Sequence, residues 1–198
     1  MSDGYLGNSH LKKSGTDIEW TPELIKEYMK CAEDPIYFAK EYIKIVHVDK
    51  GLVPFEMYDY QKEIVQKITD NRRLAVLTAR QSGKTTTAVA VILHYILFNE
   101  FKTVAILANK GDSAREVLAR IKLAYEALPK WMQQGIEEWN KGNISLENGC
   151  QVIAGTTSSS AIRGKSCVTG DTRVCIEDND NYYFVEIEKI INKVDSSK

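Results

Sequence analysis

Two short stretches of the sequence carry residue types that do chemistry. The first is Thr78-Ala79-Arg80-Gln81-Ser82-Gly83-Lys84-Thr85, between a short apolar run and a helical pattern. A Gly-Lys-Thr between a strand and a helix is the arrangement of phosphate-binding loops, in which backbone N–H groups face phosphate oxygens. The second is Cys167-Val168-Thr169-Gly170-Asp171-Thr172, where a thiol stands just before a Gly-Asp turn signal. A cysteine in such a setting can act as a nucleophile.

The first stretch predicts an ATP and Mg²⁺ site. Lys84 would reach the β- and γ-phosphates, and the Thr85 hydroxyl would be the metal ligand. The residues expected around the nucleotide in this stretch are Arg80, Gln81, Ser82, Gly83, Lys84, Thr85 and Thr86. The pattern GxxxxGK[ST] has a glycine where this chain has Thr78, so the motif is incomplete there. The alternative is an ordinary helix start after a strand.

The segments that must position this loop alternate between strand and helix. Residues 74–77 and 103–108 predict buried strands, and residues 83–98 and 112–127 predict helices. This alternation predicts a parallel α/β sheet. Three helices are expected before it, from Thr21-Pro22-Glu23, from Asp34-Pro35 and over 57–68, and residues 1–15 are expected to be a loose tail. Asn148-Gly149 between strands 143–146 and 151–154 predicts a hairpin.

Composition and charge exclude some classes of protein. The chain has 198 residues, 43% hydrophobic and 27% charged, with a net charge of −1. These values are ordinary for a globular protein and argue against nucleic-acid binding by overall charge alone. No apolar run is long enough to span a membrane. The four cysteines (Cys31, Cys150, Cys167 and Cys175) show no CxxC spacing, which argues against zinc and favours a reducing compartment.

The region around the phosphate loop resembles the large terminase subunits of tailed bacteriophages. The resemblance is carried by a loop that lacks its first glycine but has Arg80-Gln81 before Gly-Lys-Thr, and by the Tyr58-Asp59-Tyr60-Gln61 segment. It extends over most of residues 20–166. These subunits are ATPases that pump DNA into the capsid and cut it with a separate nuclease domain.

The resemblance implies roles for three side chains. Tyr60 and Gln61 match an adenine-reading pair, and a Gln amide can both donate to and accept from an adenine edge. Arg80 matches an arginine that acts on the γ-phosphate, where a guanidinium neutralises developing charge. The alternatives are core packing for Tyr60 and a solvent-facing loop position for Arg80.

The ATPase pattern stops where an acidic strand is expected. No apolar run ending in Asp-Glu follows Ser166, so the Mg²⁺ lacks the Asp expected near it and the attacking water lacks its Glu base. The metal-binding nuclease domain is also missing. We therefore expect the chain alone to hydrolyse ATP poorly.

The sequence from Cys167 resembles the first block of a self-splicing intein of the Hint family. Cys at the first position and Gly170-Asp171-Thr172 before a strand carry this resemblance. It implies that Cys167 attacks the Ser166 carbonyl to form a thioester. Residues 173–176 and 182–185 predict strands, and 186–194 a short helix. The alternative is that Cys167 is a buried structural thiol, which is also the expectation for Cys175.

Later intein blocks have no match in this chain. His10, His47 and His94 all precede Cys167, so none can supply the Thr-x-x-His block. Residues 167–198 carry seven acidic and four basic side chains, a net charge of −3. The resemblance therefore implies an N-terminal half of a split intein, completed by a second chain that also carries the rest of the motor.

These observations predict three segments: a flexible tail (1–20), an incomplete P-loop ATPase part with N-terminal helices (21–166) and a β-rich N-intein fragment (167–198). The expected partners are the complementary C-intein chain and, after trans-splicing, DNA, the small terminase subunit and the capsid portal. The expected location is the cytoplasm of the infected bacterial host, with no membrane contact. Two alternatives remain: a stand-alone helicase-like ATPase with a structural β tail, and a nucleotide-binding module that does not hydrolyse.

Overall fold

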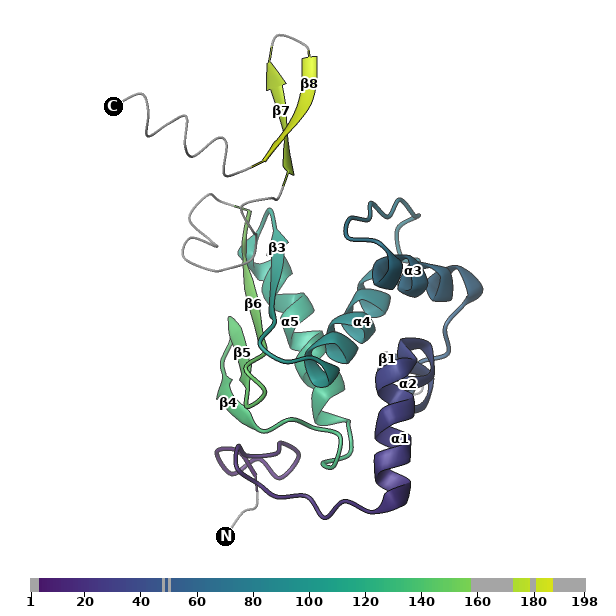
Figure 1. Cartoon of the computed structure of the whole chain (residues 1–198), viewed down its shortest axis with the longest axis vertical. Helices are drawn as coiled ribbons and strands as arrows, with labels where there is room; N and C mark the ends of the chain where they lie inside the picture. The colour runs from purple at the N-terminus through teal and green to yellow at the C-terminus, as the bar shows by residue number, and fades with distance from the viewer. Residues whose placement is uncertain (1–3, 48, 50, 158–172, 179–180, 187–198) are drawn as a thin grey trace, which may run out of the picture. The chain divides into compact units, whose positions relative to one another are not determined.

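The computed structural model describes residues 4–47, 49, 51–157, 173–178 and 181–186. The chain divides into two compact units, Met1–Ala161 and Ile162–Lys198, and each is treated by itself. The first unit holds all five described helices and a mixed four-stranded sheet (Figure 1). In the second unit the described residues form one antiparallel pair, β7 (Arg173–Asp178) and β8 (Asn181–Glu186).

The three N-terminal helices form near their predicted positions, and two of them begin at the predicted capping residues. The helix α1 (Pro22–Glu33) begins at Thr21, whose hydroxyl accepts a hydrogen bond from the Leu24 N–H at 3.3 Å. The helix α2 (Pro35–Tyr42) begins at Asp34, whose carboxylate accepts from the backbone N–H groups of residues 36 and 37. The helix α3 (Asp59–Asp70) follows Tyr58.

The central sheet has the strand order β3-β6-β5-β4. Its strands are β3 (Thr103–Ala108), β4 (Ile136–Trp139), β5 (Asn143–Leu146) and β6 (Gln151–Thr156). Only β3 and β6 are parallel, since β5 pairs antiparallel with both β6 and β4. The expected sheet is therefore confirmed as α/β but is mixed rather than parallel.

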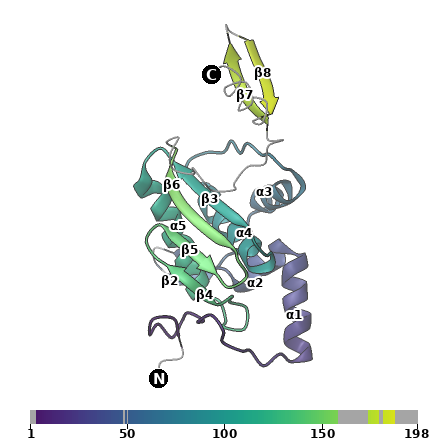
Figure 2. The ribbon, with the colours of Figure 1, turned by 60° about the vertical axis from the view of Figure 1, so that its left-hand side comes forward.

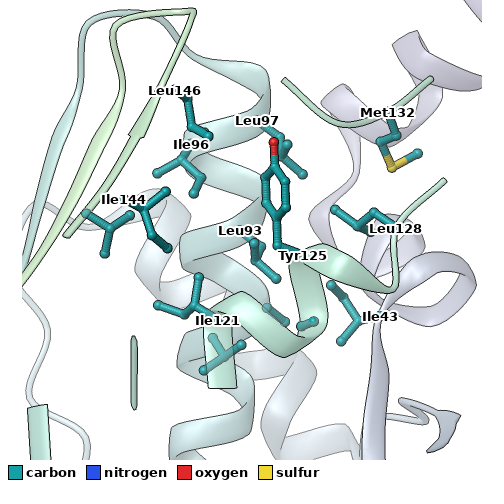
Figure 3. Close-up of a cluster of buried hydrophobic side chains, with 14 of the residues drawn as sticks. Ile43, Leu93, Ile96, Leu97, Ile121, Tyr125, Leu128, Met132, Ile144 and Leu146 are labelled. Atoms are coloured by element: carbon teal, nitrogen blue, oxygen red, sulfur yellow. The ribbon is translucent and has the colours of Figure 1, made fainter. Parts of the chain in front are cut away.

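Two long helices cover one face of this sheet. The helix α5 (Gly111–Glu126) packs on β3 and β6, and α4 (Lys84–Phe98) packs on α5 (Figure 2). The helices α2 and α3 pack in turn on α4. Figure 3 shows the core that results, with Leu93, Ile96, Leu97, Ile121, Tyr125, Ile144 and Leu146 all buried. Because α4 is apolar on nearly all sides, it can be buried between these elements.

Residues 4–16 are not the loose tail that their composition predicts. Leu11 is 2% exposed and belongs to the main core. The backbone N–H of Lys12 donates to Gln133 Oε1 at 2.9 Å, and the Lys12 carbonyl accepts from Ile136 N–H at 3.0 Å. The expectation failed because these partners lie more than 100 residues away in the sequence.

The Glu147 carboxylate also holds this N-terminal segment. It accepts hydrogen bonds from the backbone N–H groups of Gly135 at 2.6 Å and Gly15 at 3.1 Å, and lies 3.3 Å from the Lys12 ammonium. Burial alone would raise the pKa of Glu147, but the two N–H donors and the Lys12 charge together lower it. The charged form of Glu147 therefore stabilises the docked segment.

The expected strand at 74–77 does not form. None of the described strands pairs with it, and Leu77 is 99% exposed. Among the described strands, β3 is the last at one end of the sheet, so its outer edge has no described strand beside it. An apolar run becomes a central strand only where neighbouring strands pair with it.

A second hairpin was not expected. The strands β1 (Lys44–His47) and β2 (Gly51–Pro54) pair antiparallel. The Gly51 backbone has a φ of +69°, which suits glycine. This hairpin contributes residues to a pocket beside the phosphate loop.

Candidate nucleotide-binding site

The loop at 78–83 is a tight turn that ends on the N-terminus of α4. The Thr78 and Ser82 hydroxyl oxygens are 2.8 Å apart, and Ser82 Oγ donates to the Ala79 carbonyl at 2.9 Å. Gly83 caps the helix with a φ of +75°, and Gln81 has a φ of +61°. A left-handed backbone at two positions folds the loop back over the helix end.

Lys84 is the first residue of α4, and its ammonium lies inside the loop. Nζ donates to the Ala79 carbonyl at 2.6 Å and the Thr78 carbonyl at 3.2 Å, and lies 3.4 Å from Ser82 Oγ. A positive charge beside the N-terminus of a 15-residue helix favours an anion there. An entering anion would have to draw Lys84 away from these two carbonyls.

The three threonines after Lys84 differ in exposure. Thr85 is exposed, Thr86 is half-buried, and Thr87 is buried with its hydroxyl donating to the Gly83 carbonyl at 3.2 Å. Of the three, Thr85 has the most exposed side chain, and its expected role as a metal ligand stays a prediction. Within the described part of the chain, no group of three or more His, Cys, Asp or Glu side chains could hold a metal.

Tyr60 and Gln61 both contact the loop. The Tyr60 hydroxyl donates to the Ser82 carbonyl at 2.6 Å. Gln61 is 3% exposed, and a Cβ added to Gly83 would lie 2.5 Å from Gln61 Nε2. Gln61 Oε1 accepts from the Tyr58 backbone N–H at 2.9 Å, so one amide oxygen lone pair is already used. Both side chains link α3 to the loop.

A pocket of about 410 Å³ lies against this loop. Gln81, Ser82, Gly83 and Thr86 line one part of it. The other part is lined by the β1–β2 hairpin and the segment after it. These residues are Ile45, Val53, Pro54, Phe55, Glu56, Tyr58, Tyr60 and Gln61. The sequence predicted the loop side and the Tyr60-Gln61 pair. It missed the hairpin wall, because nothing local relates residues 45–56 to residue 83.

The remaining predicted site residues are Arg80, Ser166 and Cys167. The Arg80 side chain is exposed. Ser166 and Cys167 lie outside the described residues, as do the predicted turn at 170–171 and all of the predicted helix except its first residue. Glu186, that first residue, ends strand β8 instead.

The two cysteines of the first unit are buried free thiols. Burial, together with the nearby Glu27 carboxylate, raises the pKa of Cys31 to about 12, so it stays a thiol at neutral pH. Burial also raises the pKa of Cys150. Neither is suited to act as a nucleophile.

In the described part of the chain, no helix is both long and apolar enough to cross a membrane.

Two comparisons bear on this chain. A family model described as "Terminase large subunit, T4likevirus-type, N-terminal" matches residues 75–182. Among solved structures, the crystal structure of the HK97 bacteriophage large terminase is similar, with a TM-score of 0.54 and 18% sequence identity. The match covers 67% of this chain but only 29% of the HK97 chain. At this identity the likeness concerns the fold alone. The family match starts at the exposed segment and runs past Cys167 into strand β8.

Proposed function

Because the chain belongs to the family of terminase large subunits of the T4likevirus type, matching its N-terminal part, we propose that residues 21–166 are the ATP-binding part of a motor that packages viral DNA. The complete motor would hydrolyse ATP in the cytoplasm of the infected bacterium. Its partners would be DNA, the small terminase subunit and the capsid portal. The match spans 29% of the length of the HK97 terminase.

The observation that carries the ATP proposal is the position of Lys84. Its ammonium lies at the N-terminus of α4, inside a loop bordered by a pocket of about 410 Å³. In the proposed complex, Lys84 exchanges the Ala79 and Thr78 carbonyls for phosphate oxygens, and Thr85 binds Mg²⁺. Arg80 turns inward to the γ-phosphate, which its exposed position permits.

The ATP proposal is tested by calorimetric titration of the full chain with ATP and Mg²⁺. Saturable binding that is lost in Lys84→Ala supports it. Lys26→Ala, which removes the same charge from an exposed position on α1, serves as the control for charge and should retain binding. If the wild-type chain binds no ATP, or Lys84→Ala binds as well as the wild type, the proposal is wrong.

We propose further that residues 167–198 are the N-terminal part of a split intein. The Cys167 thiolate would attack the Ser166 carbonyl carbon, forming a C–S bond as the Ser166–Cys167 C–N bond breaks, and the thiol proton would end on the freed Cys167 amine. The complementary chain would then accept the acyl group. This transfer would join Ser166 to the remainder of the motor. The complementary chain would also supply the missing acidic strand, because no Asp or Glu occurs from Gln151 to Ser166.

The splicing proposal is tested by intact mass after mixing the chain with the candidate companion chain from the same genome. Loss of residues 167–198, together with a peptide that spans Ser166 and companion sequence, supports it. Cys167→Ala should show neither product, whereas Cys175→Ala should show both. An unchanged wild-type mass with a companion that binds overturns it.

One observation favours a second candidate, a stand-alone ATPase in which the tail belongs to the motor fold. The family match continues through residue 182, and strand β7 ends in Glu177-Asp178. Under this candidate the isolated chain hydrolyses ATP, Cys167→Ala keeps that activity, and Glu177→Gln loses it. The splicing proposal expects no appreciable hydrolysis by the isolated chain.

A further inference from the structure

The residues that line the pocket beside the phosphate loop differ in chemistry. Ser82, Gly83 and Thr86 line it around the N-terminus of α4, next to Lys84, whereas Val53, Pro54 and the acidic residue Glu56 line the part formed by the β1–β2 hairpin and the segment after it. A phosphate group near Glu56 would be repelled, while an uncharged ring would fit the apolar lining. If ATP binds as proposed above, its base therefore lies on the side of Glu56 and the two tyrosines.

Tyr60 and Gln61 are occupied in holding the loop. The Tyr60 hydroxyl is fixed to the Ser82 carbonyl at 2.6 Å. The Gln61 amide is nearly completely buried, accepts from the Tyr58 N–H and packs on Gly83. Neither side chain can turn towards a ligand without giving up these contacts with the loop. Their position suits residues that set the shape of the loop.

Tyr58 has more free aromatic surface than Tyr60, and its hydroxyl is not tied to the loop. Tyr58 is 68% exposed against 40% for Tyr60, and the two rings lie parallel, with an interplanar angle of 9° and centroids 5.7 Å apart. Tyr60, anchored to Ser82, thus supports one face of Tyr58 while the ring remains accessible from the pocket. An offset parallel arrangement is favourable for aromatic rings and for bases.

We propose that Tyr58 is the residue on which the base of the nucleotide stacks, and that Tyr60 and Gln61 act as positioning residues for the phosphate loop. This inference rests on the proposed ATP binding. It assigns recognition of the base to a residue that lies two positions before the expected Tyr60-Gln61 pair. It also predicts that a change at Tyr60 weakens phosphate binding, whereas a change at Tyr58 does not.

The test is calorimetric titration of the full chain with two probes, ATP and inorganic tripolyphosphate, the second of which has no base. Tyr58→Ala should weaken ATP binding about 5- to 150-fold, the range that stacking of one base on an aromatic ring contributes. It should leave tripolyphosphate binding unchanged. Tyr58→Phe should bind both probes as the wild type does, because the ring is retained.

Tyr60→Phe is the matched variant for the positioning role. It removes only the hydroxyl that holds Ser82, so it should weaken ATP and tripolyphosphate by the same factor. The inference is overturned if Tyr58→Ala binds ATP as tightly as the wild type, or if it weakens both probes equally. If the wild-type chain binds neither probe, the proposed ATP function itself fails and the inference falls with it.

Discussion

Replacing Gly83 by alanine tests the contact between α3 and the phosphate loop directly. Gly83 has a φ of +75°, a backbone conformation that alanine adopts only at a cost of about 1–2 kcal/mol. The new Cβ would also lie 2.5 Å from Gln61 Nε2. Because Gln61 is 3% exposed and bonded to the Tyr58 N–H, it cannot move aside freely.

The two contributions can be separated with a second glycine. Gly15 has the same φ of +75°, but a Cβ there would meet nothing within 4 Å, so Gly15→Ala should cost only the backbone term. Displacing Gln61 would break its part-buried hydrogen bond and take the acceptor from the Tyr58 N–H, which costs about 1–3 kcal/mol. Gly83→Ala should therefore lower the free energy of unfolding by about 2–5 kcal/mol, clearly more than Gly15→Ala.

The assay is urea denaturation of Gly83→Ala, Gln61→Ala and the double variant. Removing the Gln61 amide removes the clash, so the double variant should be more stable than the sum of the single effects predicts, by about 1 kcal/mol or more. Strict additivity would refute the packed Gln61–Gly83 contact. An effect of Gly83→Ala equal to that of Gly15→Ala would refute it as well.

Three further outcomes are expected. Leu11→Ala should cost about 2–4 kcal/mol by urea denaturation, whereas Leu6→Ala, at an 89% exposed position, should be neutral; equal effects would mean that the N-terminal segment is loose. The pKa of Glu147 is lowered in the folded chain, so its stabilisation is present above its ordinary pKa of 4.5 and is lost as the pH falls through the lowered value. Glu147→Gln should thus be less stable than the wild type at neutral pH, with the difference shrinking as the pH falls below 4.5, and parallel curves would contradict this. Lys84→Ala should abolish tripolyphosphate binding yet lower the unfolding free energy by only about 1 kcal/mol, because its ammonium donates to carbonyls of a partly exposed loop; retained anion binding would count against the site.

Local signals in the sequence predicted most of the helices. Thr21 and Asp34 are followed by proline and cap α1 and α2 as expected, because an N-cap depends on residues only two or three positions away. Asn148-Gly149 predicted the turn between β5 and β6 for the same reason. In the structure, the Asn148 amide also donates to the Ile96 carbonyl at 2.7 Å, which ties the turn to α4.

The elements that were missed or wrongly predicted depend on distant partners. Strand β4 carries two adjacent glutamates and gives no clear strand pattern, yet it forms because β5 pairs with it. The apolar run at 74–77 has a strand pattern, yet no described strand pairs with it. The N-terminal segment is ordered by Gln133 and Glu147. Composition reports none of these relations, since each joins residues far apart in the chain.

The residues of the candidate site also fall into those that the local sequence predicts and those that depend on distant partners. The loop and its lysine were predictable, because a Gly-Lys-Thr before a helix fixes the local geometry. The orientation of Tyr58 and the apolar wall from β2 were not, because they arise from how α3 packs on α4 and how β2 packs on α2. The roles of Ser166 and Cys167 remain predictions from sequence.

The exposed run Leu74-Ala75-Val76-Leu77 bears on whether this chain stays unassociated in a cell. Leu74 and Val76 are each about 40% exposed and Leu77 almost completely so, with an exposed leucine, Leu107, on the end strand β3. Apolar, strand-forming segments without a partner readily pair with other chains. We expect the isolated chain to self-associate on heating or at high concentration. Leu77→Lys should raise the solubility of the chain. Synthesis at the same time as the partner chain would shorten the time during which the run at 74–77 can pair with a wrong chain.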